Sequence, residues 1–349
     1  MKKQISYPKI KQFGDVVGSV VRQATFMGLD ENEDAIYDGL QPKPTLTFKG
    51  TVKVHGTNAG ISYNYEKGMW AQSRENIITP KKDNAGFAFF VESKKELFEE
   101  MFKDIAIENN IDLNENTISI YGEWAGGNIQ KNVAVGQLEK SLYLFGVKIS
   151  PFDTEEVAYW VDSTLYDSES DKVYNINNFK TYEIEVDFNN PKMSQNKMLE
   201  LTLEVEAECP VAKAFDVSGI GEGIVWSVSY KEQHYRFKTK GDKHAGKSKV
   251  KTVRKIDEAK LTKVQAVVDK VTPVWRLDQM LTKSCDLMNG GKLDRSKMGT
   301  FMKLMMSDIL EEEMLTLTEA GLEPKDIGRG VSEIAKRYFF EREQNAVGL

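Results

Sequence analysis

Cysteine and histidine are scarce in this chain of 349 residues, which contains two cysteines and three histidines. Cys209 and Cys285 lie far apart in the sequence and have no metal-ligand spacing, so we expect free thiols in a reducing compartment. Because no cysteine and histidine cluster is present, we do not expect a structural zinc site.

Long apolar runs are also lacking, and no stretch approaches the length of a membrane span. The first residues, Met1 to Ser6, carry charge but are not followed by an apolar segment, so we expect no secretory signal. We therefore expect a cytoplasmic protein. The length is sufficient for two domains with a sizeable core.

Positive charge is in deficit over the whole chain, whose formal net charge is -6. Between Arg236 and Lys255, however, nine lysines and arginines accompany a single acid, Asp242. A concentrated basic segment in an acidic protein favours a local phosphate-binding surface. Considered by charge alone, a solvated loop explains the segment equally well.

The spacing of apolar residues predicts an N-terminal part made chiefly of strands. Helices are expected at 16–27 and 87–106, and residues 199–207 fit either a helix or a strand. The expected strands are 46–54, 61–63, 69–71, 117–127, 141–149, 157–161, 182–188, 221–228 and 235–240. Among these, 61–63 and 69–71 form the arms of a hairpin, and the last two strands pair with each other.

After Lys255 the alternation gives way to helical spacing in three blocks, at about 257–288, 295–315 and 324–342. The whole pattern predicts an α+β protein. Its domains are an antiparallel-sheet domain, a basic linker and a small all-helical C-terminal domain. We expect these at 1–245, 246–256 and 257–349.

The stretch Thr51-Val52-Lys53-Val54-His55-Gly56-Thr57-Asn58 combines a strand end, a lysine and a glycine turn. Alternation directs Lys53 away from the neighbouring valines, and Gly56 allows the backbone to turn tightly beside a ligand. A lysine in this position is a nucleophile only if its amine is neutral, which burial and nearby positive charge can arrange. A bare Lys-x-x-Gly is better explained as a surface lysine on an edge strand, so the interpretation depends on other motifs.

Further motifs follow downstream. They are Arg74, Tyr-Gly-Glu-Trp-Ala-Gly-Gly-Asn-Ile-Gln-Lys-Asn-Val at 121–133, Ser-Leu-Tyr-Leu-Phe-Gly-Val-Lys-Ile at 141–149, Gly-Glu-Gly-Ile-Val at 221–225 and Lys-Thr-Lys at 238–240. This order resembles the nucleotidyltransferase superfamily of ATP-dependent ligases and mRNA capping enzymes. Lys-Val-His-Gly-Thr-Asn and the 121–133 motif are similar to the RNA ligase 2 family of phage and RNA-editing ligases. The resemblance covers roughly residues 45–245 and implies an ATP-grasp-like ligase (nucleotidyltransferase) domain there.

The resemblance also implies a role for each matched residue. Lys53 would form a lysyl-N–AMP intermediate, and His55 would serve catalysis or nucleic-acid placement. Glu222 would lie near the metal and the reacting phosphate, as the one residue assigned to the metal. The implied catalytic residues are Lys53, His55, Glu222, Lys238 and Lys240, of which the two later lysines would neutralise the triphosphate.

The implied nucleotide contacts extend over most of the motifs. Glu123 would bind a ribose hydroxyl, Phe145 would stack on adenine, and Arg74 would hold the sugar or an RNA phosphate. As isolated residues they would instead be read as a turn acid, a core aromatic and a hairpin charge. The full set of nucleotide-binding residues is Lys53, Val54, Asn58, Arg74, Glu123, Phe145, Val225, Lys238 and Lys240.

The sequence departs from the family pattern in two places. Gly146 follows the stacking aromatic where the family often has an acid, and Trp226-Ser227 stands where it often has a lysine. Because of the second departure, the nucleotide contacts of the family are not transferred in detail to the strand that contains Trp226 and Ser227. His234 and His244 gain no role from the resemblance.

The implied function is an RNA ligase (ATP) that uses ATP with Mg²⁺ or Mn²⁺ to join RNA ends, with nicked duplex RNA as the expected substrate. The resemblance suggests a phage-encoded protein that acts in RNA repair in the host cytoplasm, and one nucleotidyltransferase domain with one appended domain suggests a monomer. An ATP-dependent DNA ligase shares the core chemistry, although His55 disfavours it. An mRNA guanylyltransferase would use GTP and usually carries an OB-fold where this chain is helical. A non-catalytic RNA-binding module is the remaining alternative, but it would not need all the catalytic side chains.

Overall fold

The computed structural model describes residues 2–29, 33, 35–38, 41–152, 157–162, 165–244, 255–289 and 291–347. The described residues pack as two compact units. The first lies within Met1–Val17, Leu46–Val186 and Ser194–Arg254, and the second within Gly18–Thr45, Asp187–Met193 and Lys255–Leu349. The predicted basic linker at 246–256 falls mostly on residues 245–254, which lie outside the described residues.

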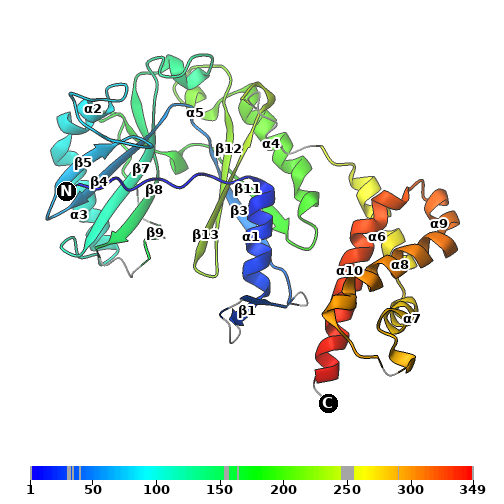
Figure 1. The fold of residues 1–349 in the computed structure, drawn as a ribbon. Helices are drawn as coiled ribbons and strands as arrows, with labels where there is room; N and C mark the ends of the chain where they lie inside the picture. The colour runs from blue at the N-terminus through cyan, green and yellow to red at the C-terminus, as the bar shows by residue number, and fades with distance from the viewer. Residues whose placement is uncertain are drawn as a thin grey trace. The chain divides into compact units, whose positions relative to one another are not determined.

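The first unit contains two sheets (Figure 1). The larger has seven strands in the order β10-β8-β7-β4-β5-β6, with β9 paired to β8. Its strands are β4 (Thr57–Asn64), β5 (Gly68–Gln72), β6 (Ile77–Ile78), β7 (Asn116–Ala125), β8 (Ser141–Pro151), β9 (Tyr159–Val161) and β10 (Val173–Asn175). The pairs are antiparallel except for β10 with β8, which is parallel. The predicted α+β class is therefore confirmed, and the predicted antiparallel sheet contains one parallel pair.

The two faces of the larger sheet differ in chemistry. One face carries apolar side chains such as Ile61 and Ile120, which pack with helices α2 (Phe87–Ser93) and α3 (Lys95–Glu108) in one core. The opposite face carries buried polar side chains, including Ser62, whose hydroxyl bonds that of Ser119 at 2.8 Å. Because successive residues of a strand point to opposite faces, the same alternation that builds the core leaves a polar face for a site.

The second sheet has the order β11-β3-β12-β13. Its strands are β3 (Thr45–Val52), β11 (Thr181–Asp187), β12 (Gly223–Tyr230) and β13 (Gln233–Lys240), and helices α4 (Gln195–Ala207) and α5 (Pro210–Lys213) precede β12. Helix α4 covers one face, where Thr202 donates to Thr239 at 2.6 Å, and Trp226 and Phe237 are fully buried. Residues 236, 238 and 240 alternate with these buried residues on β13 and project from the other face.

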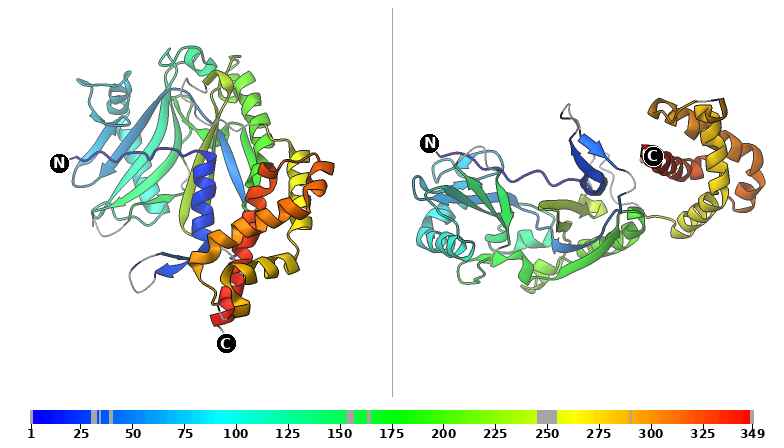
Figure 2. Two further views of the ribbon diagram at one scale, coloured as in Figure 1. Left: turned by 45° about the vertical axis from the view of Figure 1, so that its right-hand side comes forward. Right: turned by 90° about the horizontal axis from the view of Figure 1, so that it is seen from below.

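An extended N-terminal strap, residues 2–12, runs from the larger sheet past β13 to helix α1 (Phe13–Thr25) (Figures 1 and 2). The amide of the buried Gln72 pairs with both main-chain groups of Ile5, at 3.1 and 2.5 Å, and the Tyr121 hydroxyl donates to the Ile5 carbonyl at 2.6 Å. The main chain of Lys11 then forms an isolated parallel β-bridge with that of Phe237 on β13. The strap therefore connects the two sheets through buried polar groups.

The second unit contains the short strands β1 (Phe26–Leu29) and β2 (Ala35–Tyr37) and a helical bundle. The bundle helices are α6 (Glu258–Val271), α7 (Val274–Cys285), α8 (Met298–Glu312), α9 (Met314–Glu319) and α10 (Pro324–Val347). Val268, Phe301 and Phe339 form part of its fully buried core. None of the described helices is both long and apolar enough to cross a membrane.

Several predicted elements differ in detail from the structure. The helix predicted at 87–106 is two helices because the backbone leaves the helical region at Lys94. The first C-terminal block also divides, since Pro273 lacks an amide hydrogen and ends α6 before α7 begins. Residues 199–207 are helical, within α4. The predicted hairpin is confirmed, with Ser62 opposite Trp70, and both cysteines are unpaired and buried.

The core of the larger sheet gives the first test. Phe98→Ala, in α3, removes a ring that is 0% exposed and should lower the free energy of unfolding by about 3–5 kcal/mol. Urea unfolding followed by circular dichroism measures the change. Phe89→Ala, in α2, is the matched control because its ring is 67% exposed, and it should cost less than about 1 kcal/mol. Equal losses in the two variants would contradict the assignment of this core.

Candidate active site

Lys53 lies immediately after β3, at the point where the second sheet meets the turn that leads into the first. Its main-chain amide donates to the Gly223 carbonyl at 2.8 Å, which continues the pairing with β12 past the end of the strand. Val52 and Val54 are buried on either side, as the alternation predicted. The side chain of Lys53 consequently faces the opposite way, and it is 18% exposed.

The turn after Lys53 requires glycine at position 56. A Cβ on Gly56 would lie 2.3 Å from the Trp124 carbonyl oxygen, which is part of the backbone of β7. The Gly56 amide donates to Glu123 Oε1 at 3.0 Å, and the Gln130 side chain donates to the Gly56 carbonyl at 3.2 Å. The close approach fixes the turn against β7, and Asn58, at the start of β4, lies directly opposite Glu123.

Glu222 is the centre of the charged cluster. Its carboxylate is fully buried, and Oε2 lies 2.6 Å from the Lys53 ammonium and 3.0 Å from His55 Nδ1. Lys240 forms an ion pair with the other oxygen, Oε1, at 2.5 Å. Burial alone would raise the pKa of Glu222, but the hydrogen bond from His55 and the charges of Lys53 and Lys240 outweigh it and hold the pKa well below its usual range. Glu222 is therefore an ionised carboxylate shared by three cationic or hydrogen-bonding groups.

Lys238 and Lys240 project from the same face of β13 because they are two residues apart on a strand. Lys238 lies opposite Val225, and Lys240 lies opposite Gly223. Burial, followed by the nearby charges of Lys240 and Lys53, lowers the pKa of Lys238, and the charge of Arg74 adds to the effect. Arg74 itself is exposed in the turn after β5. Lys53 and Lys240 on the buried carboxylate, with the charges of Lys238 and Arg74 nearby, give a surface suited to a polyanion such as a triphosphate.

Glu123 lies on the polar face of β7, the face that carries Ser119, and is partly exposed. Burial raises its pKa, and the Lys53 charge and the hydrogen bond from Gly56 compensate only in part. Phe145 is half-buried and occupies a bulge in β8, where the pairing with β7 shifts between Tyr121 and Gly122. The edge of the Tyr7 ring meets Phe145 with the ring centres 5.1 Å apart.

The structure brings Lys53, His55, Glu222 and Lys240 into direct contact, with Glu123 joined to them through the Gly56 turn. Lys238 and Arg74 lie within electrostatic reach. Val54 is buried and Val225 is half-buried facing Lys238.

Sequence reasoning missed three side chains at this site. The His244 ring lies 5.4 Å from that of His55, and burial lowers its pKa. Its Nδ1 is buried without a hydrogen bond to any described residue. Tyr7 and Trp160 enter the site from the strap and from β9, which carry no recognisable motif. Only the position of His244, four residues after Lys240, offered a signal in the sequence.

A divalent metal has no ready-made cage here. Within the described part of the chain, no three His, Cys, Asp or Glu side chains gather to hold an ion. Both Glu222 oxygens are already engaged by basic groups. These donors fit a magnesium-type ion that is bound mainly by substrate phosphates and water, with one carboxylate nearby.

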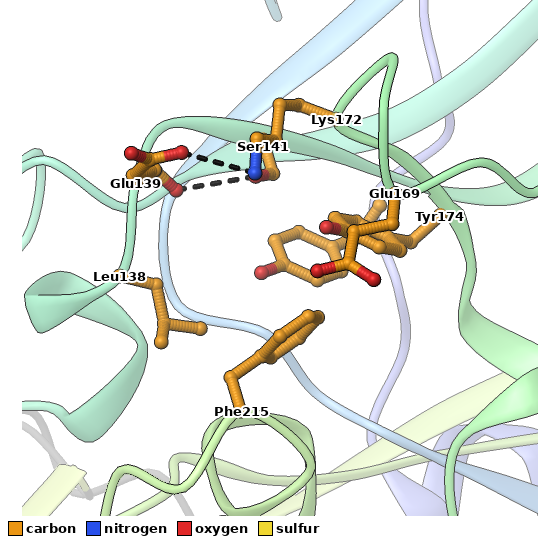
Figure 3. A pocket seen from close by; sticks show the side chains of 8 residues that line it. Leu138, Glu139, Ser141, Glu169, Lys172, Tyr174 and Phe215 are labelled. Atoms are coloured by element: carbon orange, nitrogen blue, oxygen red, sulfur yellow. Dashed lines mark hydrogen bonds and ion pairs between the residues drawn. The ribbon is translucent and has the colours of Figure 1, made fainter.

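A separate pocket of about 170 Å³ lies beside β8 and β10 (Figure 3). Its lining residues are Leu138, Glu139, Ser141, Tyr143, Glu169, Lys172, Tyr174 and Phe215. Lys172 forms an ion pair with Glu139 at 3.0 Å, and the rings of Tyr143 and Tyr174 stack with centres 5.5 Å apart. None of the residues predicted for the active site lines this pocket.

The shared carboxylate generates a prediction about stability. Glu222→Gln leaves the Lys53 and Lys240 charges without a buried counter-charge, so the free energy of unfolding at pH 7 should fall by about 3 kcal/mol. Because the folded-state pKa is depressed, the stabilisation is present above the ordinary pKa of 4.5 and is lost as the pH falls through the lower folded value. Urea unfolding from pH 7 to pH 3 should therefore show the two proteins converging in acid.

The control for this measurement is Glu200→Gln, which removes an exposed ion pair with Lys197. It should change the free energy of unfolding by less than about 1 kcal/mol at every pH. A constant difference between wild type and Glu222→Gln down to pH 3 would argue against the depressed pKa.

Comparison with known proteins identifies the family to which this chain belongs. The family model described as RNA ligase matches residues 47–240. Solved structures of a Naegleria gruberi RNA ligase, one with PPi and one of a mutant with ATP and Mn, align with TM-scores of 0.40 and identities of 13% and 14%. Each alignment covers 69% of this chain and 57% of the Naegleria chain. No curated protein sequence matches. The matched span takes in every residue of the charged cluster around Glu222, and the chain belongs to the RNA ligase family.

Proposed function

We propose that this protein is an ATP-dependent RNA ligase that joins RNA 3′-OH and 5′-phosphate ends through AMP bound to Lys53. The observation that carries the proposal is the Lys53 ammonium, 2.6 Å from a fully buried Glu222 and surrounded by further cations, inside the span that matches the RNA ligase family. A binding module would have no need of a lysine held at the end of a strand against a buried acid.

In the first step, Lys53 attacks ATP. Its ammonium must first lose a proton, since only a neutral amine is a nucleophile, and Glu222 Oε2 is the acceptor in place. As the triphosphate attracts Lys240, one of the charges that depress the Glu222 pKa is withdrawn, which makes the carboxylate a better base. The lysine nitrogen then forms a bond to the α-phosphorus, the bond to the β-phosphate oxygen breaks, and pyrophosphate leaves.

The remaining side chains position the nucleotide. Glu123 would accept from a ribose hydroxyl and Phe145 would stack on the base. Lys238 and Lys240 would neutralise the triphosphate. The other contacts that we propose for the nucleotide are those of Val54, Asn58, Arg74 and Val225.

The second and third steps transfer the activated phosphate. An oxygen of the RNA 5′-phosphate attacks the phosphorus bound to Lys53, the nitrogen–phosphorus bond breaks, and RNA-adenylate forms. The RNA 3′-OH then attacks the 5′-phosphate, and AMP leaves. Each step is a phosphoryl transfer, in which positioning and charge neutralisation account for most of the rate. We assign His55, which bonds Glu222, to catalysis or to placing the RNA end.

A bound Mg²⁺, or Mn²⁺, would add positive charge to the phosphates and stabilise the charge that develops on them. Glu222 would support the ion, directly or through water. The resemblance of the sequence motifs to ligases of the phage type supports nicked duplex RNA as substrate, recognised by its shape. It also supports a monomer that works in cytoplasmic RNA repair. The bundle at 257–349 would contact the RNA backbone.

The intermediate gives the most direct test. Incubation with α-³²P-ATP and Mg²⁺, followed by denaturing electrophoresis, should label wild-type protein and leave Lys53→Ala unlabelled. Lys49→Ala is the matched control, since Lys49 is an exposed lysine on the same segment, in β3, and should label like wild type. Folded wild-type protein that takes no label from ATP or any other nucleoside triphosphate would exclude the ligase and favour the RNA-binding module.

The substrate preference is tested by joining assays. The same two RNA strands should be sealed roughly tenfold faster or more when a complementary RNA aligns them as a nick than when they are free, because alignment replaces a bimolecular encounter. A DNA nick of the same sequence is the control and should be sealed more slowly. Equal rates for free and aligned ends would contradict the nick-sealing preference, and faster sealing of DNA would support a DNA ligase.

A further inference from the structure

Arg236 occupies an unusual place for a charged side chain. It precedes Lys238 by two residues on β13, so it projects from the same face of the strand, about 7 Å further along it. Its guanidinium lies over the Trp160 ring, 3.8 Å from the ring centre, and 5.5 Å from the centre of the Tyr7 ring. The side chain is half-buried between these rings.

The donors of Arg236 have no acceptor in the described part of the chain. The guanidinium forms no ion pair or hydrogen bond with any described residue. Burial lowers the pKa of Arg236, and the negative charge of Asp162 raises it without forming an ion pair. A guanidinium carries five N–H donors and no acceptor. Because the side chain is half-buried and its donors are not engaged by described residues, they are available to a ligand that brings acceptors.

The surroundings of Arg236 are aromatic and adjoin Phe145. The Tyr7 ring lies between, with its centre 5.1 Å from that of Phe145 and 5.4 Å from that of Trp160. Gly146, the residue after Phe145, lies beside both groups: a Cβ at that position would be 3.3 Å from the Trp160 ring and 3.9 Å from the Arg236 guanidinium. The charged group beside Phe145 is therefore the Arg236 guanidinium, which is a hydrogen-bond donor, and no carboxylate follows Phe145 in the chain.

We propose that Arg236 contributes to binding of the nucleotide base by donating hydrogen bonds to acceptor atoms on the edge of the purine that stacks at Phe145. This inference rests on the proposed function. An arginine fork can recognise purine ring nitrogens, and it cannot accept from the exocyclic amine of adenine. The Trp160 ring supports the planar guanidinium from one side, and a lysine at this position could not reproduce a planar group with several donors. The three surrounding rings favour a planar base over an RNA phosphate as the occupant.

The test compares acceptor-deleted nucleotides in wild type and in Arg236→Gln. Equilibrium binding of ATP, 7-deaza-ATP and 1-deaza-ATP is measured with all proteins in a Lys53→Ala background, so that the result does not depend on adduct formation. The Arg236→Gln change should weaken ATP binding roughly tenfold to hundredfold. One of the two deaza analogues should bind the Arg236 protein more weakly than ATP by a similar factor. The same analogue should bind the Arg236→Gln protein as well as ATP does, because the interaction is already lost.

Two variants act as controls. Arg236→Lys retains the charge and should bind as weakly as Arg236→Gln. Lys67→Gln removes a cation over an aromatic ring elsewhere, 5.3 Å from the centre of Phe152, and should bind ATP normally. Circular dichroism and thermal melting check that each protein is folded.

Several outcomes would overturn the inference. They are unchanged ATP binding in Arg236→Gln, full rescue by lysine, and additive losses for the analogue and the variant. If Arg236→Gln binds ATP normally but, in a protein that retains Lys53, joins RNA ends more slowly, Arg236 is assigned to an RNA phosphate. Labelling of Lys53 by ATP is a separate measurement, so a ligase that labels normally while Arg236→Gln binds ATP normally would retain the proposed function and lose this one.

Discussion

The arrangement of the site depends on one buried carboxylate. Glu222 lies at the start of β12 and meets Lys53 from the end of β3, His55 from the turn and Lys240 from the end of β13. A carboxylate in a nonpolar interior is unfavourable unless partners neutralise it. The ends of β3 and β13 and the turn after β3 therefore bring their basic groups to a single carboxylate beside β12, and Lys53 is held at this point. A polyanion that approaches these residues would compete with Glu222 for the same cations, so under the proposed function substrate binding would be linked to release of Lys53.

The polar face of each sheet follows from ordinary strand alternation. On β7 the residues between the core side chains include Ser119, Tyr121 and Glu123, and on β13 they are Arg236, Lys238 and Lys240. The larger sheet therefore supplies an acid and aromatic rings, and the second sheet supplies cations. Under the proposed function, the larger sheet would hold the base and sugar of the nucleotide and the second sheet would hold its phosphates.

Much of this could be read from the sequence because the relevant signals are local. The parity of Val52 and Val54 fixed the direction of Lys53, and the residues after Lys255 showed helical spacing. The breaks at Lys94 and Pro273 were overlooked because periodicity continues across them. Tyr7 and Trp160 could not be found, since their importance comes from neighbours distant in the sequence. The parallel pairing of β10 with β8 is likewise a tertiary choice that no local pattern encodes.

The N-terminal strap has a consequence for how the chain reaches its folded state. Ile5 is held by Gln72 and Tyr121, and Lys11 bridges to Phe237 on β13. The strap therefore lacks its partners until β5 and β7, and finally β13, have been synthesised. Contacts between positions so distant in sequence form slowly. Docking of the strap is expected to be a late event in biogenesis, and a chain that stops before β13 would leave the contacts of Lys11 with Phe237 and of Tyr7 with Arg236 unformed.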